Sequence, residues 1–244
     1  MSSEYVNVNN SKLHFRITGK GDPLLLLHGW TQTAAFWEPY VNELARKFRV
    51  YALDLPGHGK TGVLPPGFSL RKASVDVEGF ITQLGLTTVK AIGLSYGGLL
   101  LLEMTARNPA LIEAMVLIAV SDRFNGKDRW KDTPSVEFRD LDPGFQDYLK
   151  KHHPFGDNQI NALFNKDLDY AINLTPAKLQ KIRTRLLIVN GDRDEVAGID
   201  GALRIFKHVP GAALWIMPNT GHMAIDERNK TQFLETSEEF LLNP

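Results

Sequence analysis

Residues 91–100 read AIGLSYGGLL, an apolar run that is interrupted by Gly-Leu-Ser-Tyr-Gly-Gly and then resumes at once. Glycine weakens strands and helices alike, so Gly93, Gly97 and Gly98 indicate a backbone that needs close approach. The apolar residues on the two sides predict a buried strand at Val89–Leu94 and a helix at Tyr96–Arg107. Ser95 would then occupy the tight turn between the two elements.

Short apolar runs on both sides of this turn have the length and composition of strands that are buried on both faces. These runs are Leu24–Leu27, Val50–Leu53, Ala114–Val120, Leu186–Asn190 and Ala212–Met217. Helical spacing lies between most of them, at Ala35–Lys47, Leu70–Leu84 and Ile199–His208, with a last helix ending near Leu242. An antiparallel hairpin, Tyr5–Val8 with Lys12–Ile17, precedes them all. The alternation predicts a mostly parallel sheet with helices on both faces.

One long segment, residues 122–180, lacks a convincing buried strand and is rich in charge, loop-forming residues and aromatic side chains. A structureless loop of this length would be unusual inside a compact domain. We therefore expect a core of residues 1–121 and 181–244 and a small helical cap of residues 122–180. The aromatic residues of this cap, among them Trp130, Phe138 and Phe164, suggest an apolar acyl or aryl group in the substrate, although aromatics of a helical insertion more often pack against its own underside.

Composition and charge exclude several classes of function. The 244 residues contain 28 basic and 28 acidic side chains, so no net field attracts nucleic acid or an acidic membrane. The chain has no cysteine, which removes disulfides, thiolate metal sites and cysteine nucleophiles. Neither a signal peptide nor a membrane span is visible. The expectation is a cytoplasmic protein without metal or organic cofactor, and the sequence leaves monomer and dimer open.

The pattern Gly93-x-Ser95-x-Gly97 between a strand and a helix is a nucleophile elbow. In such a turn the residues two before and two after the serine pack almost against each other, so that only glycine avoids a clash. The serine is held in a strained conformation that projects its hydroxyl beyond the carboxyl end of the sheet. The bare pattern is weak, and its strand-turn-helix setting makes it much stronger.

A serine hydroxyl becomes a nucleophile when a base takes its proton and an acid orients that base. His222, in NTGH (219–222), follows the last predicted strand and would open at the same sheet edge as Ser95. Asp194, in GDRDE (191–195), follows the strand before it and is the favoured acid. Asp192, Glu195 and Asp122 are its rivals, Asp122 because it too follows a strand end. The other histidines are less suited as the base: His14, His28, His58, His152, His153 and His208.

Five motifs resemble the α/β-hydrolase family, of the small-esterase type. They are LLLLHGW (24–30), DLPGHG (54–59), GLSYGG (93–98), GDRD (191–194) and GH (221–222). The likeness covers nearly the whole chain and implies the α/β-hydrolase fold, with about eight strands and a small helical cap. Ser95 separates the chain from relatives with an aspartate nucleophile, such as dehalogenases and epoxide hydrolases.

The resemblance implies that backbone N–H groups of Trp30 and Tyr96 form an oxyanion hole beside Ser95, Asp194 and His222. It implies a serine hydrolase that cleaves carboxylic esters of small to medium acyl or aryl substrates through an acyl-enzyme on Ser95. Lactone hydrolysis, carbon–carbon bond hydrolysis and perhydrolysis use the same triad and remain open. A ligand receptor or signalling protein on this fold is the alternative outside catalysis.

Overall fold

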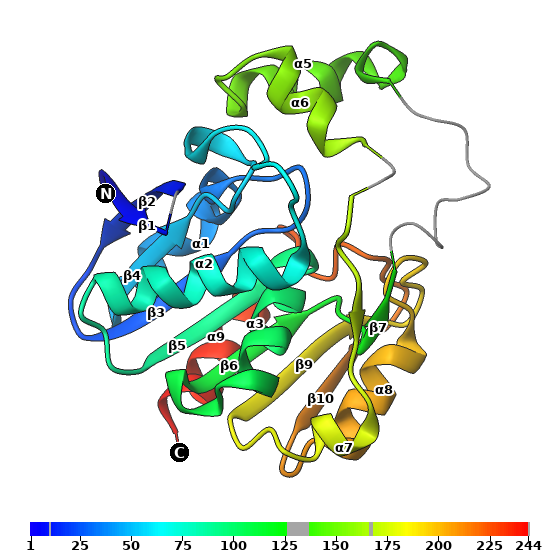
Figure 1. The fold of residues 1–244 in the computed structure, drawn as a ribbon. Helices are drawn as coiled ribbons and strands as arrows, with labels where there is room; N and C mark the ends of the chain where they lie inside the picture. Colours follow the sequence, from blue (N-terminus) through cyan, green and yellow to red (C-terminus); the bar gives the residue numbers. More distant parts are fainter. Residues whose placement is uncertain (10, 126–136, 166–167, 244) are drawn as a thin grey trace.

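An eight-stranded sheet in the order β1-β2-β4-β3-β5-β6-β9-β10 forms the centre of the molecule (Figure 1). The computed structural model describes residues 1–9, 11–125, 137–165 and 168–243. The strands are β1 (Ser2–Val8), β2 (Ser11–Thr18), β3 (Asp22–Leu27), β4 (Phe48–Leu53), β5 (Val89–Leu94), β6 (Ile112–Ile118), β9 (Arg185–Gly191) and β10 (Ala213–Met217). The pairs β1–β2 and β2–β4 are antiparallel, and the other neighbours are parallel. The predicted hairpin and mostly parallel sheet are confirmed.

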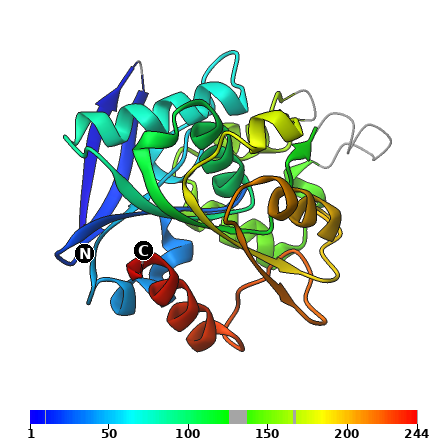
Figure 2. The same ribbon diagram turned by 90° about the horizontal axis from the view of Figure 1, so that it is seen from below.

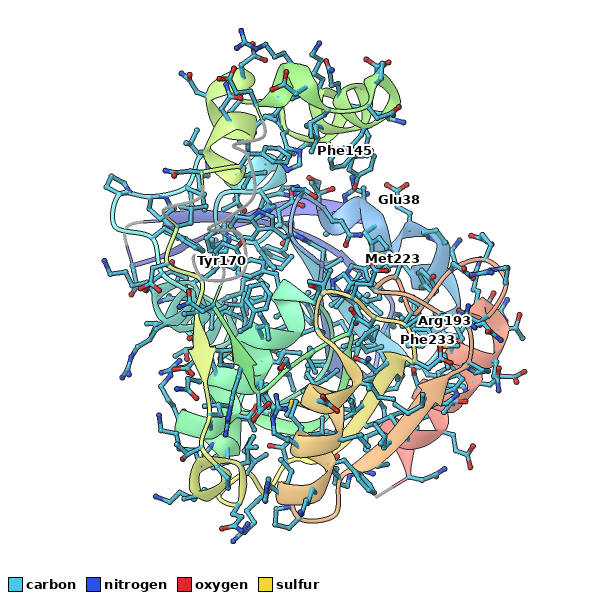
Figure 3. The ribbon with its side chains drawn as sticks, turned by 90° about the vertical axis from the view of Figure 1, so that its right-hand side faces the viewer. Glu38, Phe145, Tyr170, Arg193, Met223 and Phe233 are labelled. Atoms are coloured by element: carbon cyan, nitrogen blue, oxygen red, sulfur yellow. The ribbon has the colours of Figure 1, made fainter. Side chains whose placement is uncertain are left out.

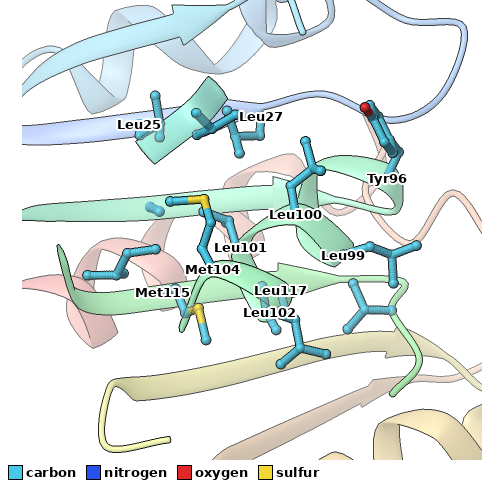
Figure 4. Packing of buried hydrophobic residues seen from close by; sticks show 14 of the residues in the cluster. Leu25, Leu27, Tyr96, Leu99, Leu100, Leu101, Leu102, Met104, Met115 and Leu117 are labelled. Atoms are coloured by element: carbon cyan, nitrogen blue, oxygen red, sulfur yellow. The ribbon is translucent and has the colours of Figure 1, made fainter. Parts of the chain in front are cut away.

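The central strands are apolar almost throughout because both faces of the sheet are covered. Successive side chains of a strand point to opposite faces. In β3, Leu25 and Leu27 therefore belong to one core cluster, and Leu24 and Leu26 to the other. Figure 4 shows side chains of α3 (Tyr96–Arg107) lying between those of β3 and β6 in the first cluster.

Helices cover both faces, as Figure 2 shows from below. The helices α2 (Leu70–Gln83), α3 and α8 (Ile199–His208) contribute to one cluster, and α1 (Glu38–Leu44) and α9 (Lys230–Leu242) to the other. The expected single helix 35–47 is two elements, a 3-10 helix Ala34–Trp37 and then α1. Pro39 lies in the first turn of α1, where its missing N–H costs nothing, so a new helix begins there. Among the described residues, no helix is both long enough and apolar enough to span a bilayer.

The segment between β6 and β9 places α5 (Pro143–His152) and α6 (Asp157–Leu163), here called the helical layer, above the carboxyl ends of the strands (Figure 1). Two short strands that the sequence pattern missed, β7 (Arg123–Phe124) and β8 (Ile172–Asn173), pair antiparallel beneath it. The short helix α7 (Pro176–Leu179) packs against α8 beside the sheet. The division into a core and a cap at residues 122–180 stays a prediction, and Trp130 lies outside the described residues.

One buried side chain, Gln159 of α6, fastens the helical layer to the sheet's loops. Its Nε2 donates to the carbonyl oxygens of Gly57, Gly59 and Gly62 at 3.3, 2.8 and 2.9 Å. Its Oε1 accepts the Phe155 N–H at 3.1 Å. These carbonyls follow β4, so the helical layer is joined to the loop whose His58 ring stacks on that of Tyr96 at 5.7 Å.

Three buried histidines form a column between the sheet and the helical layer. The rings of His28 and His58 lie 5.1 Å apart, and those of His58 and His153 lie 5.9 Å apart. Burial lowers the pKa of His28 from 6.5 to about 4. Burial likewise lowers the pKa of His58 well below its ordinary value and lowers that of His153. The column is therefore uncharged in the folded protein near neutral pH.

We expect Gln159→Leu to lower the free energy of unfolding by about 1–3 kcal/mol, because it leaves buried carbonyls without a donor. Gln146→Leu on α5 is the matched control, since within the described part of the chain its amide bonds to the carbonyl oxygens of Arg139 and Leu141, just before α5. Thermal denaturation and limited proteolysis within residues 137–165 measure the effect. Equal melting temperatures for the two variants would contradict the fastening role.

The histidine column makes the protein acid-sensitive above the range in which carboxyl groups titrate. Between pH 6.5 and about 4 the unfolded chain binds a proton at His28 that the folded protein does not, so stability falls as the pH falls. For His28 the loss is on the order of 3 kcal/mol. His153→Leu should flatten the pH dependence of urea unfolding in this window, and the control Gln146→Leu, which removes no titratable group, should leave it unchanged. A slope that is identical in all three proteins would refute the assignment.

Candidate active site

Ser95 lies in the predicted turn between β5 and α3, in a left-handed backbone conformation with φ +48°. A Cβ atom added to Gly93 would lie 2.8 Å from the carbonyl carbon of Gly97, which confirms the expected close packing across the turn. A Cβ on Gly97 would meet the carbonyl oxygen of Leu27 at 2.5 Å. The turn therefore admits only glycine at these positions, and its tight packing holds Ser95 in a conformation that L residues rarely adopt.

His222 links Ser95 to Asp194 through hydrogen bonds. Its Nε2 lies 2.9 Å from the Ser95 Oγ, and its Nδ1 lies 2.9 and 3.0 Å from the two carboxylate oxygens of Asp194. With the Nδ1 proton donated to Asp194, Nε2 is free to accept the proton of the Ser95 hydroxyl. The structure thus brings together the three residues that the sequence proposed as nucleophile, base and acid.

The environment of Asp194 keeps its carboxyl group ionised. Burial alone would raise the pKa of Asp194, but the hydrogen bond and charge of His222 and the backbone N–H groups of Ala197 and Val196 together lower it. The backbone N–H groups of Val196 and Ala197 also donate to Oδ1, each at 2.9 Å. The side chain of Asp194 is completely buried, whereas that of His222 is 24% exposed. The buried anion orients a base that solvent and substrate can reach.

The rivals of Asp194 have other partners or positions. Asp122 is buried and forms an ion pair with Arg204 of α8, with a shortest distance of 2.8 Å. Asp192 accepts the N–H of Thr220 at 3.0 Å and so ties the loop after β9 to the loop that carries His222. Glu195 is exposed. Asp194 is therefore the acid that the geometry presents to His222.

The loop after β3 contains Trp30, whose backbone N–H is one of the two oxyanion donors that the family resemblance implies. Among the described residues, neither the Trp30 N–H nor the Tyr96 N–H has a hydrogen-bond acceptor. Thr31, the next residue, has φ +64°, which is unusual for a β-branched side chain. Two unpaired N–H groups beside Ser95 suit an oxyanion, and the strained loop indicates that their position is enforced.

Two side chains support this loop: Gln32, which the sequence analysis did not name, and His58, which it set aside as a base. The Gln32 Oε1 accepts the Gly29 N–H at 2.9 Å, and the His58 Nε2 accepts the Thr31 N–H at 3.2 Å. The three-residue spacing from Gly29 to Gln32 is a local signal for such a turn. His58 gives no such signal, because it lies 27 residues away along the chain. His58 is therefore a structural hydrogen-bonding residue, which agrees with its being less suited as the base.

A cavity of about 460 Å³ lies over Ser95. Its lining includes Trp30, Leu99, Phe124, Phe164 and Tyr170, together with His222 and Met223, and is mostly apolar. No Lys, Arg, Asp or Glu is among the described residues that line it. Figure 3 shows Tyr170 and Met223 below the helical layer, which carries Phe145. Of the cap aromatics named from the sequence, Phe164 lines the cavity and Phe138 does not. The cavity suits an uncharged, apolar group.

A second chain of hydrogen bonds of the same kind lies elsewhere. The Ser3 Oγ is 2.6 Å from the His14 Nε2, and the His14 Nδ1 is 2.7 Å from the Asp54 Oδ2. Ser3 is exposed on strand β1 and does not line the cavity. Asp54 also accepts N–H groups of Ala34 and Lys60, so it joins separate loops. Hydrogen bonding alone does not mark a catalytic site; the strained turn and the cavity distinguish Ser95.

Comparison with known proteins agrees with the fold described above. The model of the alpha/beta hydrolase family matches residues 24–236. A pimeloyl-[acyl-carrier protein] methyl ester esterase of Nitrosomonas europaea is 24% identical over 87% of this chain and 93% of its own. Esterase RhEst1 from Rhodococcus sp. ECU1013 superimposes with a TM-score of 0.79 and 22% identity over 100% and 99% of the two chains. The enol-lactonase from Burkholderia xenovorans LB400 gives 0.79 and 22% over 98% and 99%. The chain belongs to the α/β hydrolase family.

Proposed function

We propose that this hydrolase is a serine carboxylesterase that cleaves esters of small to medium, uncharged acyl or aryl groups. The observation that carries the proposal is the position of His222, within 3.0 Å of both Ser95 and Asp194 at the base of an apolar cavity. The esterase name of the Nitrosomonas europaea relative supports the same reaction class.

The first half of the reaction forms an acyl-enzyme. The His222 Nε2 takes the proton of the Ser95 hydroxyl while Oγ attacks the ester carbonyl carbon. Ionised Asp194 stabilises the imidazolium that results. The N–H groups of Trp30 and Tyr96 stabilise the oxyanion of the tetrahedral intermediate. When the intermediate collapses, the imidazolium returns its proton to the leaving oxygen, and the alcohol departs from a Ser95 ester.

The second half releases the acid. Water gives a proton to the His222 Nε2 as its oxygen attacks the acyl carbon, and the same two N–H groups stabilise the second oxyanion. Collapse breaks the bond to the Ser95 Oγ, which recovers its proton from His222. The carboxylic acid leaves, and the free enzyme is restored without a net change in protonation of the triad.

A panel of p-nitrophenyl esters of increasing acyl length, with a lactone added, tests the reaction class. We expect many turnovers on the esters, and a fluorophosphonate should inactivate the protein by adding its mass to the peptide that contains Ser95. Ser95→Ala is the control and should neither turn over nor be labelled. Labelling at another residue with loss of activity would refute the nucleophile. Turnover of the lactone alone would replace the ester proposal, and slow or absent turnover would favour a receptor.

Three aspartate variants test the acid. Asp194→Asn should lower kcat by on the order of 10⁴, because an amide does not compensate the imidazolium and favours the wrong tautomer. Asp122→Asn should instead lower the melting temperature through its broken ion pair with Arg204, with kcat nearly retained. Asp192→Asn should lower kcat less than Asp194→Asn does, because Asp192 holds the loop of His222 through Thr220 and makes no hydrogen bond to His222 among the described contacts. A larger loss of kcat in Asp122→Asn would move the acid to the end of β6.

A further inference from the structure

The side chain of Trp30 connects the loop after β3 to Leu163 and Tyr170, two residues that lie between β6 and β9 in the chain and are here called points of the covering segment. Its Nε1 donates to the carbonyl oxygen of Leu163, the last residue of α6, at 2.9 Å. Its ring stacks on that of Tyr170, with centroids 5.0 Å apart and an angle of 11° between the planes. Leu163 and Tyr170 both line the cavity. One indole therefore holds two points of the covering segment.

Both contact points are themselves anchored. Leu163 is buried, and it lies one turn after Gln159, which is bonded to three carbonyls of the loop after β4. Asp169, the residue before Tyr170, accepts with its backbone carbonyl oxygen the N–H of Leu70, the first residue of α2, at 2.8 Å. The indole thus lies between two fixed points and is itself restrained.

The same indole is in contact with the residue that carries the second proposed oxyanion donor. Its ring meets that of Tyr96 edge to face at 4.9 Å, with an interplanar angle of 89°. It also meets the ring of His58 at 4.8 Å, and His58 accepts the N–H of Thr31. The conformation of the strained loop at Trp30 and Thr31 is therefore fixed from the side chain as well as from the backbone.

We propose that Trp30 is a positioning residue. Its indole binds Leu163 and Tyr170, and these contacts hold the loop in the conformation that directs the Trp30 backbone N–H toward the oxyanion. The inference rests on the proposed ester hydrolysis. It makes the covering segment part of the support for the transition state as well as a wall for the acyl group. Loss of the fastening lowers kcat for every ester, whatever its size. A side chain that only lines the cavity affects long acyl groups and acts mainly through KM.

The smallest substrate separates the two roles. The acetyl group of p-nitrophenyl acetate has one methyl beyond its carbonyl and fills little of the cavity. Loss of a whole oxyanion donor costs about 10²–10³ in kcat, so for a displaced donor in Trp30→Phe we expect about a 10- to 50-fold fall with KM within about twofold. Tyr170→Leu should also lower kcat on the acetate, because it removes the stacking partner of the Trp30 indole. The double variant should fall no further than the lower single variant, because both remove one fastening.

Trp215→Phe on β10 is the matched control, since Trp215 does not line the cavity, and it should retain kcat. Normal kcat on the acetate in Trp30→Phe, with loss only on long esters, would overturn the proposal. So would multiplicative losses in the double variant. If Trp30→Phe does not fold, judged by its melting temperature, normal acetate turnover in Tyr170→Leu would overturn it. A wild-type protein with neither ester turnover nor phosphonate labelling of Ser95 would instead refute the proposed function itself.

Discussion

The close approach of α3 to the sheet constrains the rest of this structure. The turn that joins β5 to α3 brings Gly97 against the backbone of Leu27 and Gly93 against Gly97, at distances that exclude a Cβ atom. This packing places the beginning of α3 beside the end of β3. The N–H of Gly97 also bonds to the carbonyl oxygen of His28 at 3.1 Å. The Tyr96 N–H and the Trp30 N–H consequently lie on adjoining segments at the cavity that Ser95 lines.

The parallel sheet then brings the remaining groups to the same edge. Asp194 and His222 follow β9 and β10, whose carboxyl ends lie beside each other. The two loops are fixed to one another, because a Cβ on Gly191 would lie 2.1 Å from the carbonyl oxygen of Thr220 and Asp192 accepts the Thr220 N–H. The distance between Asp194 and His222 thus depends on contacts between the two loops. These contacts hold the two side chains within hydrogen-bonding distance of each other.

The parts that sequence can predict are those with local signals. Val89–Leu94 and Tyr96–Arg107 have the bounds that apolar periodicity and the glycines indicate. Other features depend on partners far along the chain. The sequence near Asp122 does not predict its ion pair with Arg204, which lies 82 residues later. The sequence near Gln159 likewise does not predict its hydrogen bonds to carbonyl oxygens about 100 residues earlier. The strands β7 and β8 have two residues each, which is too short for a period to appear.

The uncharged lining of the cavity has a consequence for the fate of the product. Hydrolysis of a neutral ester in this cavity would generate a carboxylic acid, which ionises at neutral pH. The described lining meets this anion with the Trp30 and Tyr96 N–H groups and His222 beside Ser95, and with apolar side chains elsewhere, where an unpaired charge is costly. The apolar wall therefore favours the neutral ester over the ionised acid, and the carboxylate would be held at the polar base of the cavity.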